Sequence, residues 1–258
     1  MEIPDRVAIV TGGGGGVGEV IAARLASLRA VVLVVDADAA AAERVSSAIR
    51  ASGGRGEAVH ADLSEADSLG LIVERAEDLG GPHILVNNVG GWGSAGRQFP
   101  VALPGEWRRV LELNLAAPME LTQRCLPAMT RLGAGAVVNV SSSAARRAGA
   151  YRSPEYAAAK AGLIRFTTAL GDLGRERGVR VNCVVPDWIG LDRAFVELEV
   201  MSPAERREAP VLIPPGVVAD AVVDLITDDA LSGRVVVIDG GEPPRLLGRD
   251  EGTGDHTG

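Results

Sequence analysis

The chain has 258 residues, of which 47% are apolar, and a formal net charge of −8. This length suits one large α/β domain with a well-buried core, and no apolar run approaches the length of a membrane span. The acidic balance argues against nucleic acid or an anionic membrane as a partner, and the three histidines and two cysteines show no metal-ligand spacing. The N-terminus has neither a basic start nor a signal-peptide core, so we expect a cytoplasmic protein without a metal site.

The first part of the chain predicts a strand, a glycine-rich turn and a helix. The strand expected at 6–10 runs into the turn at 11–18, which reads TGGGGGVG, and a helical pattern follows. Glycines at such a turn let backbone N–H groups approach a pyrophosphate at the start of a helix. The second strand, 31–35, ends at Asp36, where a carboxylate can accept hydrogen bonds from the 2′- and 3′-hydroxyls of an adenosine ribose. The alternative is that Asp36 caps the next helix, a role that Asp38 can fill instead.

Strands and helices continue to alternate, which is typical of a doubly wound parallel α/β sheet with helices on both faces. Further helices are expected at 39–50, 65–79, 106–132 (bent or restarted near Pro118), 154–177 and 217–227, and further strands at 56–61, 83–86, 136–140, 179–185 and 234–238. Residues 191–215 are interpreted as a mobile covering segment. We expect a single domain at 1–242, followed by a flexible polar tail at 243–258.

A tyrosine and a lysine lie four residues apart in the helix expected at 154–177. Residues at this spacing share one helix face, so the phenol of Tyr156 would lie beside the ammonium of Lys160. A nearby cation favours phenolate, so we expect the pKa of Tyr156 to fall toward the working pH, which suits a general acid or base. Lys160 is also the only lysine among 26 basic residues. By itself, the pair is more typical of a solvated contact on a helix surface, and the motifs in the rest of the chain are what favour a functional role.

In their order and spacing, these motifs resemble those of the short-chain dehydrogenase/reductase family over residues 5–242. The shared features are the glycine turn at 11–18, Asp62, the Asn87-Asn88-x-Gly90 motif, Asn114, the serines at 141–143, Tyr156-x-x-x-Lys160, Pro186 and the Asp-Gly-Gly at 239–241. The resemblance implies a Rossmann domain at 1–242 and hydride transfer between a nicotinamide cofactor and an alcohol or ketone. It also implies a homotetramer, or a homodimer, built through the helix of Tyr156 and the long helix before it.

The resemblance also implies roles for single residues. Tyr156 would give or take the alcohol proton, Lys160 would hold the nicotinamide ribose, and Asn114 would hold a water in a proton relay to Lys160. Ser142 would hydrogen-bond the substrate oxygen, with Ser143 as a rival because Ser142 lies one residue further from Tyr156 than is commonest. The expected cofactor contacts are Gly12, Gly14, Gly16, Val17, Gly18, Asp36, Asp62, Leu63, Asn88, Gly90, Tyr156, Lys160, Pro186 and Ile189, and the expected substrate-pocket residues are Trp92, Ser143, Trp188 and Phe195.

Three positions depart from the family pattern. Val89 replaces the usual alanine, Asp187 replaces a glycine, and Leu191 replaces a threonine that usually contacts the nicotinamide carboxamide. Asp187 has two interpretations. Beside the nicotinamide it would favour the oxidised, cationic ring, whereas pointing away it would pair with Arg193 or another arginine.

The leading interpretation is an NAD-dependent alcohol dehydrogenase or ketone reductase with an apolar small-molecule substrate. Asp36 favours NAD(H), because Gly15 and Ala37 stand where a basic residue would receive the phosphate of NADP(H). One alternative is an NADPH-dependent reductase of 3-oxoacyl thioesters. A second alternative is a cofactor-binding member of the family with little turnover, which the changes at Asp187 and Leu191 raise.

Overall fold

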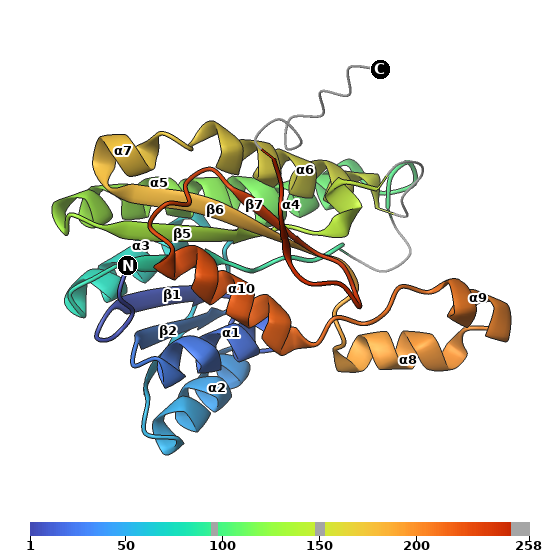
Figure 1. Ribbon diagram of the computed structural model, residues 1–258, viewed down its shortest axis with the longest axis horizontal. Coiled ribbons are helices and arrows are strands. Elements are labelled where there is room, and N and C mark those ends of the chain that lie inside the picture. The colour runs from blue at the N-terminus through green and yellow to red at the C-terminus, as the bar shows by residue number, and fades with distance from the viewer. Residues whose placement is uncertain (94–97, 148–152, 249–258) are drawn as a thin grey trace.

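The computed structural model describes residues 1–93, 98–147 and 153–248, and this part of the chain forms one eight-stranded sheet (Figure 1). The strands are β1 (Val7–Thr11), β2 (Val31–Asp36), β3 (Arg55–His60), β4 (Ile84–Asn87), β5 (Gly135–Val140), β6 (Val179–Pro186), β7 (Val235–Ile238) and β8 (Arg245–Leu246). Their order is β3-β2-β1-β4-β5-β6-β7-β8, and each neighbouring pair is parallel except the antiparallel pair β7–β8. The doubly wound α/β fold expected from the sequence is confirmed.

The helices cover both faces of this sheet (Figure 1). They are α1 (Gly16–Ser27), α2 (Ala39–Ala51), α3 (Ala66–Asp78), α4 (Pro104–Leu111), α5 (Ala117–Arg131), α6 (Pro154–Ala169), α7 (Leu173–Arg177), α8 (Asp192–Val200), α9 (Pro203–Glu208) and α10 (Pro215–Thr227). Alternate residues of β1 divide the core. Ala8 and Val10 pack with α1, α2 and α10, whereas Val7 and Ile9 pack with α3 and α5. Because both faces are covered, the inner strands β1, β5 and β6 are buried along their whole length.

The strand order reverses between β1 and β4, which lie side by side although β2 and β3 come between them in the chain. Connections leave the two strands toward opposite sides, so a crevice opens outside their carboxyl ends. Ligands of open α/β sheets bind at this point. The glycine turn at 11–18 and the Asn88–Gly90 segment meet at this edge.

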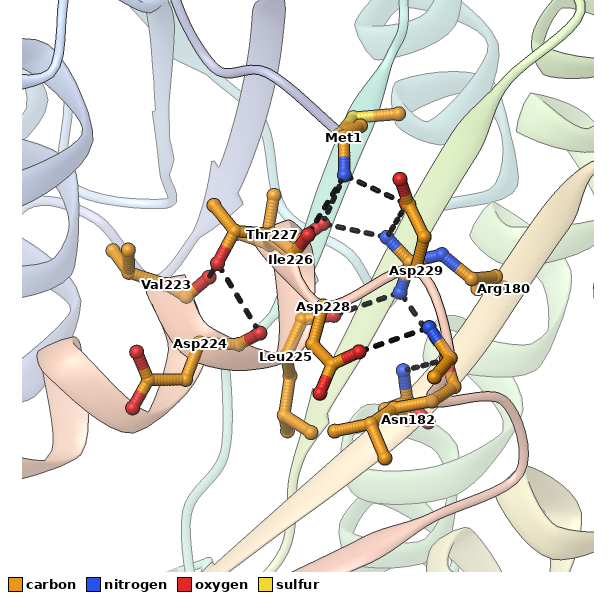
Figure 2. Close-up of polar contacts among 12 residues, drawn as sticks. Met1, Arg180, Asn182, Val223, Asp224, Leu225, Ile226, Thr227, Asp228 and Asp229 are labelled. Atoms are coloured by element: carbon orange, nitrogen blue, oxygen red, sulfur yellow. Dashed lines mark hydrogen bonds and ion pairs between the residues drawn. The ribbon is translucent and has the colours of Figure 1, made fainter.

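A buried arginine in β6 fixes the end of α10 (Figure 2). The Arg180 guanidinium donates hydrogen bonds to the carbonyls of Leu225 and Ile226 at 2.9 and 2.5 Å and pairs with Asp229. The amino group of Met1 donates to Ile226 and to Asp229 as well. Burial lowers the pKa of Arg180, and Asp229 opposes that shift. Two cations thus satisfy the last carbonyls of α10, where the helix dipole favours positive charge.

Several predicted elements differ from those observed. The helix expected at 106–132 is α4, a π-helical turn η1 (Glu112–Ala116) and α5, which begins at Ala117, where a restart near Pro118 was expected. The helix expected at 154–177 is broken between α6 and α7. The segment at 191–215, expected to be a mobile cover, contains α8 and α9, which project from the body in Figure 1. Among the described residues, no helix is long and apolar enough to cross a bilayer.

The boundary expected at 242 lies too early. Residues 245–246 form β8 against β7, with Leu246 opposite Val236, and Leu247 is buried at 3% exposure. The apolar pair Leu246-Leu247 was overlooked within an otherwise polar tail. The domain therefore continues to at least residue 247, and residues 249–258 lie outside the described part.

Candidate active site

A cavity of about 320 Å³ lies at the carboxyl ends of β4, β5 and β6. Its wall combines the start of α6 with the loops that follow these strands and with α8. Ten residues expected to act in catalysis, cofactor binding or the substrate pocket line it: Val17, Asn88, Gly90, Trp92, Ser142, Tyr156, Lys160, Pro186, Trp188 and Ile189. Two expected pocket residues, Ser143 and Phe195, do not line it, and the Phe195 side chain is exposed.

Lys160 is buried at 2% exposure, so the pair with Tyr156 is not a solvated surface contact. Its Nζ lies 5.7 Å from the centroid of the Tyr156 ring and donates a hydrogen bond to the Val140 carbonyl at 2.9 Å. Burial disfavours the ammonium and lowers the pKa of Lys160 from 10.5 to about 8. The lysine can therefore exchange a proton near neutral pH while it lies beside the phenol.

The three serines after β5 have different partners. The Ser141 hydroxyl donates to the Lys160 carbonyl at 2.8 Å and ties the strand to α6. Ser142 lines the cavity together with Tyr156. The Ser143 hydroxyl donates to Asp187 at 2.6 Å. Of the two serines expected at the substrate oxygen, only Ser142 lines this cavity.

Asp187 pairs with an arginine, as one of its two interpretations anticipated. The partner is Arg147, whose Nη2 donates to both carboxylate oxygens at 2.7 and 3.0 Å. Arg193 pairs instead with Glu197. With Ser143 as a further donor, the Asp187 charge is satisfied by the protein, although the residue borders the cavity.

Asn114 lies in the π-helical turn η1 and is fully buried. Its Nδ2 donates to the carbonyls of Gly91 and Val110, both at 2.8 Å, which holds the loop after β4 against this turn. A Cβ on Gly90 would come within 2.8 Å of Asn114 Oδ1 and 3.0 Å of Lys160 Nζ. The two polar atoms are therefore no more than about 6 Å apart, a separation that one water can bridge. Single π-turns are frequent at functional sites.

A second cavity of about 580 Å³ lies beside the glycine turn, and it shares Val17, Asn88 and Gly90 with the first. The two form a continuous groove across the point where the strand order reverses, which suits an extended dinucleotide. The remaining expected cofactor contacts on this second cavity are Gly12, Gly16, Asp36, Asp62 and Leu63.

Gly14 and Gly18 line neither cavity and instead shape the turn. A Cβ on Gly18 would collide with the Gly12 carbonyl, so only glycine permits this approach. The Asn88 side chain donates to the carbonyls of Thr11 and Gly12 at 3.0 and 3.2 Å. These contacts join the end of β4 to the turn, whose N–H groups and following helix start are suited to a pyrophosphate.

Asp36 faces the second cavity, and it is Asp38 that caps α2 by accepting from Ala40 and Ala41. The Asp36 carboxylate accepts from the backbone N–H groups of Gly14 and Asp38 at 2.9 and 3.0 Å. The alternative role of Asp36 as the helix cap is therefore wrong. Its carboxylate is held at the edge where an adenosine ribose would lie.

A nearby cation was missed in the sequence. Arg44 of α2 donates to the Gly14 carbonyl at 2.8 Å and to both oxygens of Glu19 at 2.8 and 2.7 Å. The signal is its position in the second turn of α2, the helix that follows Asp36. Arg55 lies at the start of β3, at the end of the strand far from Asp36, and pairs with Asp5.

Comparisons with known proteins agree with this geometry. A family model described as short chain dehydrogenase matches residues 6–194. Cyclohexanol dehydrogenase of Acinetobacter is 34% identical over 92% of this chain and 94% of its own length. The 3-oxoacyl-[acyl-carrier-protein] reductase FabG of Pseudomonas aeruginosa is 33% identical over 93% of this chain and 98% of its own. The solved structure of 7α-hydroxysteroid dehydrogenase complexed with NADH and 7-oxo glycochenodeoxycholic acid is similar with a TM-score of 0.83, 29% identity and coverage of 95% of this chain and 97% of that one.

Proposed function

Because the chain belongs to the short-chain dehydrogenase/reductase family, whose members are oxidoreductases with a nicotinamide cofactor, we propose that it transfers a hydride between NAD(H) and a secondary alcohol or ketone borne on an apolar ring. The observation on which this rests is the shared cavity of Tyr156, Lys160 and Ser142. The ring is suggested by the walls of Trp92 and Trp188, and by the names of the cyclohexanol and hydroxysteroid dehydrogenases.

The cofactor supplies the hydride, and the residues of this chain manage the proton and the developing charge on oxygen. In the reducing direction the Tyr156 hydroxyl protonates the substrate oxygen, while the Ser142 hydroxyl donates a second hydrogen bond to it. Lys160 lies beside the phenol, and Asn114 Oδ1 lies close to Lys160 Nζ. These two residues form a path along which Tyr156 regains its proton.

Cofactor binding follows the groove. The glycine turn and the start of α1 would hold the pyrophosphate, Asp36 the adenosine ribose, and Asp62 and Leu63 the adenine side. Lys160 would hold the ribose of the nicotinamide, and Pro186 and Ile189 would border its ring.

A second candidate is an NADPH-dependent reductase of 3-oxoacyl thioesters, as in the FabG relative. The observation in its favour is Arg44, a cation within reach of the glycine turn. Against it, Glu19 holds Arg44 by two hydrogen bonds, and Asp36 would face the additional phosphate at close range. We therefore favour NAD(H).

The test is a panel of cyclic alcohols and ketones assayed with NAD(H), on the wild type and on Tyr156→Phe. The substitution keeps the ring and removes the proton, so kcat should fall roughly 10²–10⁴-fold while NADH affinity persists. Tyr151→Phe is the matched control; Tyr151 lies outside the described residues, and full activity is expected. An active Tyr156→Phe with an inactive Tyr151→Phe would reject the assignment. NADH binding without turnover of any substrate would indicate a cofactor-binding member of the family.

A further inference from the structure

The Trp92 side chain connects the ring of Tyr156 to a cation at the rim of the cavity, Arg193. The Trp92 ring meets the Tyr156 ring edge-on, with the centroids 6.0 Å apart and an interplanar angle of 84°. The guanidinium carbon of Arg193, on the first turn of α8, lies 4.1 Å from the Trp92 centroid. Arg193 Cζ is therefore at most about 10 Å from the centre of the Tyr156 ring. Both Trp92 and Arg193 line the cavity.

The guanidinium of Arg193 makes only part of the hydrogen bonds that it could donate to the described residues. Among the described residues, its hydrogen bonding is limited to Nε, which donates to Glu197 Oε1 at 2.7 Å. Contact with the Trp92 face and the Glu197 carboxylate holds the group in place. The two Nη nitrogens remain, and an arginine fork is suited to bind a planar anion through two parallel hydrogen bonds.

The other charges on the cavity wall are already matched. Asp187 is paired with Arg147 and Ser143, and Glu197 is paired with Arg193 itself. Lys160 lies at the base, beside the reacting oxygen, and is buried. The Arg193 side chain is 67% exposed, so an anion bound to it would keep part of its hydration and would lose little by leaving water.

We propose that Arg193 determines substrate specificity by binding a carboxylate or sulfonate on the substrate, at the end opposite the hydroxyl or keto group. This inference rests on the proposed function, because it takes Tyr156 as the site of the reacting oxygen. The upper limit of about 10 Å between the Arg193 guanidinium carbon and the centre of the Tyr156 ring favours a small substrate, such as a single ring with substituents at opposite positions. Trp92, between them, supplies a flat apolar wall for the ring. The substrate class is thus an anionic cyclic alcohol or ketone.

The proposal is tested with two ketones of similar size, 4-oxocyclohexanecarboxylate and the neutral 4-methylcyclohexanone, each reduced with NADH. The measured quantity is the ratio of kcat/KM for the anionic ketone to that for the neutral one. Arg193→Gln should lower this ratio about tenfold, mainly through KM, because the contact is made equally in the ground and transition states. Arg193→Lys should restore part of the ratio, because it keeps the charge and loses the fork.

Glu197→Gln is the matched control, because it should change the ratio of kcat/KM in the opposite direction to the Arg193 variants. It removes the charge of the carboxylate that pairs with Arg193, so the ratio should rise a few-fold while the Arg193 variants lower it. We also expect added salt to lower the wild-type ratio, because salt screens the attraction between charges at the exposed rim of the cavity. If Arg193→Gln lowered kcat/KM equally for both ketones, Arg193 would only fasten α8 to Trp92, and the proposal would be overturned.

A failure of the proposed function is recognised separately. Reduction of the neutral ketone that depends on Tyr156 tests the function, whatever the role of Arg193. If neither ketone is reduced, calorimetric titration of the NADH complex with cyclohexanecarboxylate still tests the anion site. A loss of affinity in Arg193→Gln would support it, and an affinity unchanged by that substitution, or no binding by the wild type, would overturn it.

Discussion

Ser143 donates its hydroxyl hydrogen to the Asp187 carboxylate at 2.6 Å, which joins the end of β5 to the end of β6 beside the cavity. Arg147 donates to the same carboxylate, whose side chain is only 15% exposed. Ser142, one residue before Ser143, is thereby held toward the cavity. Asp187, which stands where the family usually has a glycine, thus joins the loop after β6 to the serine loop after β5.

We predict that Asp187→Asn changes the affinities for NAD⁺ and NADH by the same factor, because the carboxylate charge is met by Arg147 and Ser143. Titration of both cofactors checks this, and a larger loss for NAD⁺ would place the charge beside the nicotinamide. A double-mutant cycle of Asp187→Asn with Ser143→Ala should give a coupling free energy of about 1–2 kcal/mol in unfolding. Zero coupling would show that the hydrogen bond contributes nothing.

Lys160 should make the protein less stable at neutral pH. Its pKa is lowered to about 8 in the folded state by burial, against 10.5 for the ordinary side chain. Between about pH 8 and pH 10.5 the unfolded chain binds more protons than the folded one. The free energy of unfolding should therefore rise with pH, by roughly 3 kcal/mol across this range. Lys160→Met should be more stable at pH 7 and should lack this rise.

The measurement is denaturant unfolding of both proteins at pH 7 and at pH 10. Burial raises the pKa of Cys125 and of Cys183 to about 12, which makes stability fall above about pH 9. This opposite slope occurs in both proteins and largely cancels in their difference. Equal pH slopes for wild type and Lys160→Met would contradict the prediction.

Cofactor choice should depend on Asp36. Hydrogen bonds to a charged group are worth roughly 1.5–3 kcal/mol, so we expect NAD(H) to be preferred about a hundredfold in kcat/KM. Asp36→Ala combined with Ala37→Arg should move the preference toward NADP(H). Glu19→Gln is a useful third variant, because it releases Arg44 without touching Asp36. Equal or better use of NADP(H) by the wild type would reopen the NADPH-reductase alternative.

Assembly should use the surface between α5 and α6. A groove there is lined by apolar side chains including Met119, Leu126, Phe166 and Leu170. We predict a homotetramer of closed symmetry, and Phe166→Arg should dissociate it, since a charge would be buried at the contact. Val200→Arg, at an exposed apolar site on α8, is the control and should keep the wild-type mass. Light scattering at micromolar protein measures both, and a monomeric wild type would refute the assignment.

The sequence by itself determined the α/β fold and the order of the motifs. Strands buried on both faces must be continuous apolar runs, and the glycine turn, Asp36 and the Tyr156–Lys160 pair depend on contacts between residues near in the chain. The restart of helix 106–132 near Pro118 was predicted, but the π-turn before it was not, because a π-turn keeps a helical pattern. The pairing of residues 245–246 was missed because β8 is only two residues long.

Only the tertiary structure decided which side chains face one another across the sheet edge. Three consecutive serines look alike in the sequence, yet one supports α6, one lines the cavity and one binds Asp187. Asp187 pairs with Arg147, and Arg193 packs on Trp92. The two members of each pair lie far apart in the chain. Such pairings depend on how helices and loops pack at the ends of the strands, and no local spacing encodes that packing.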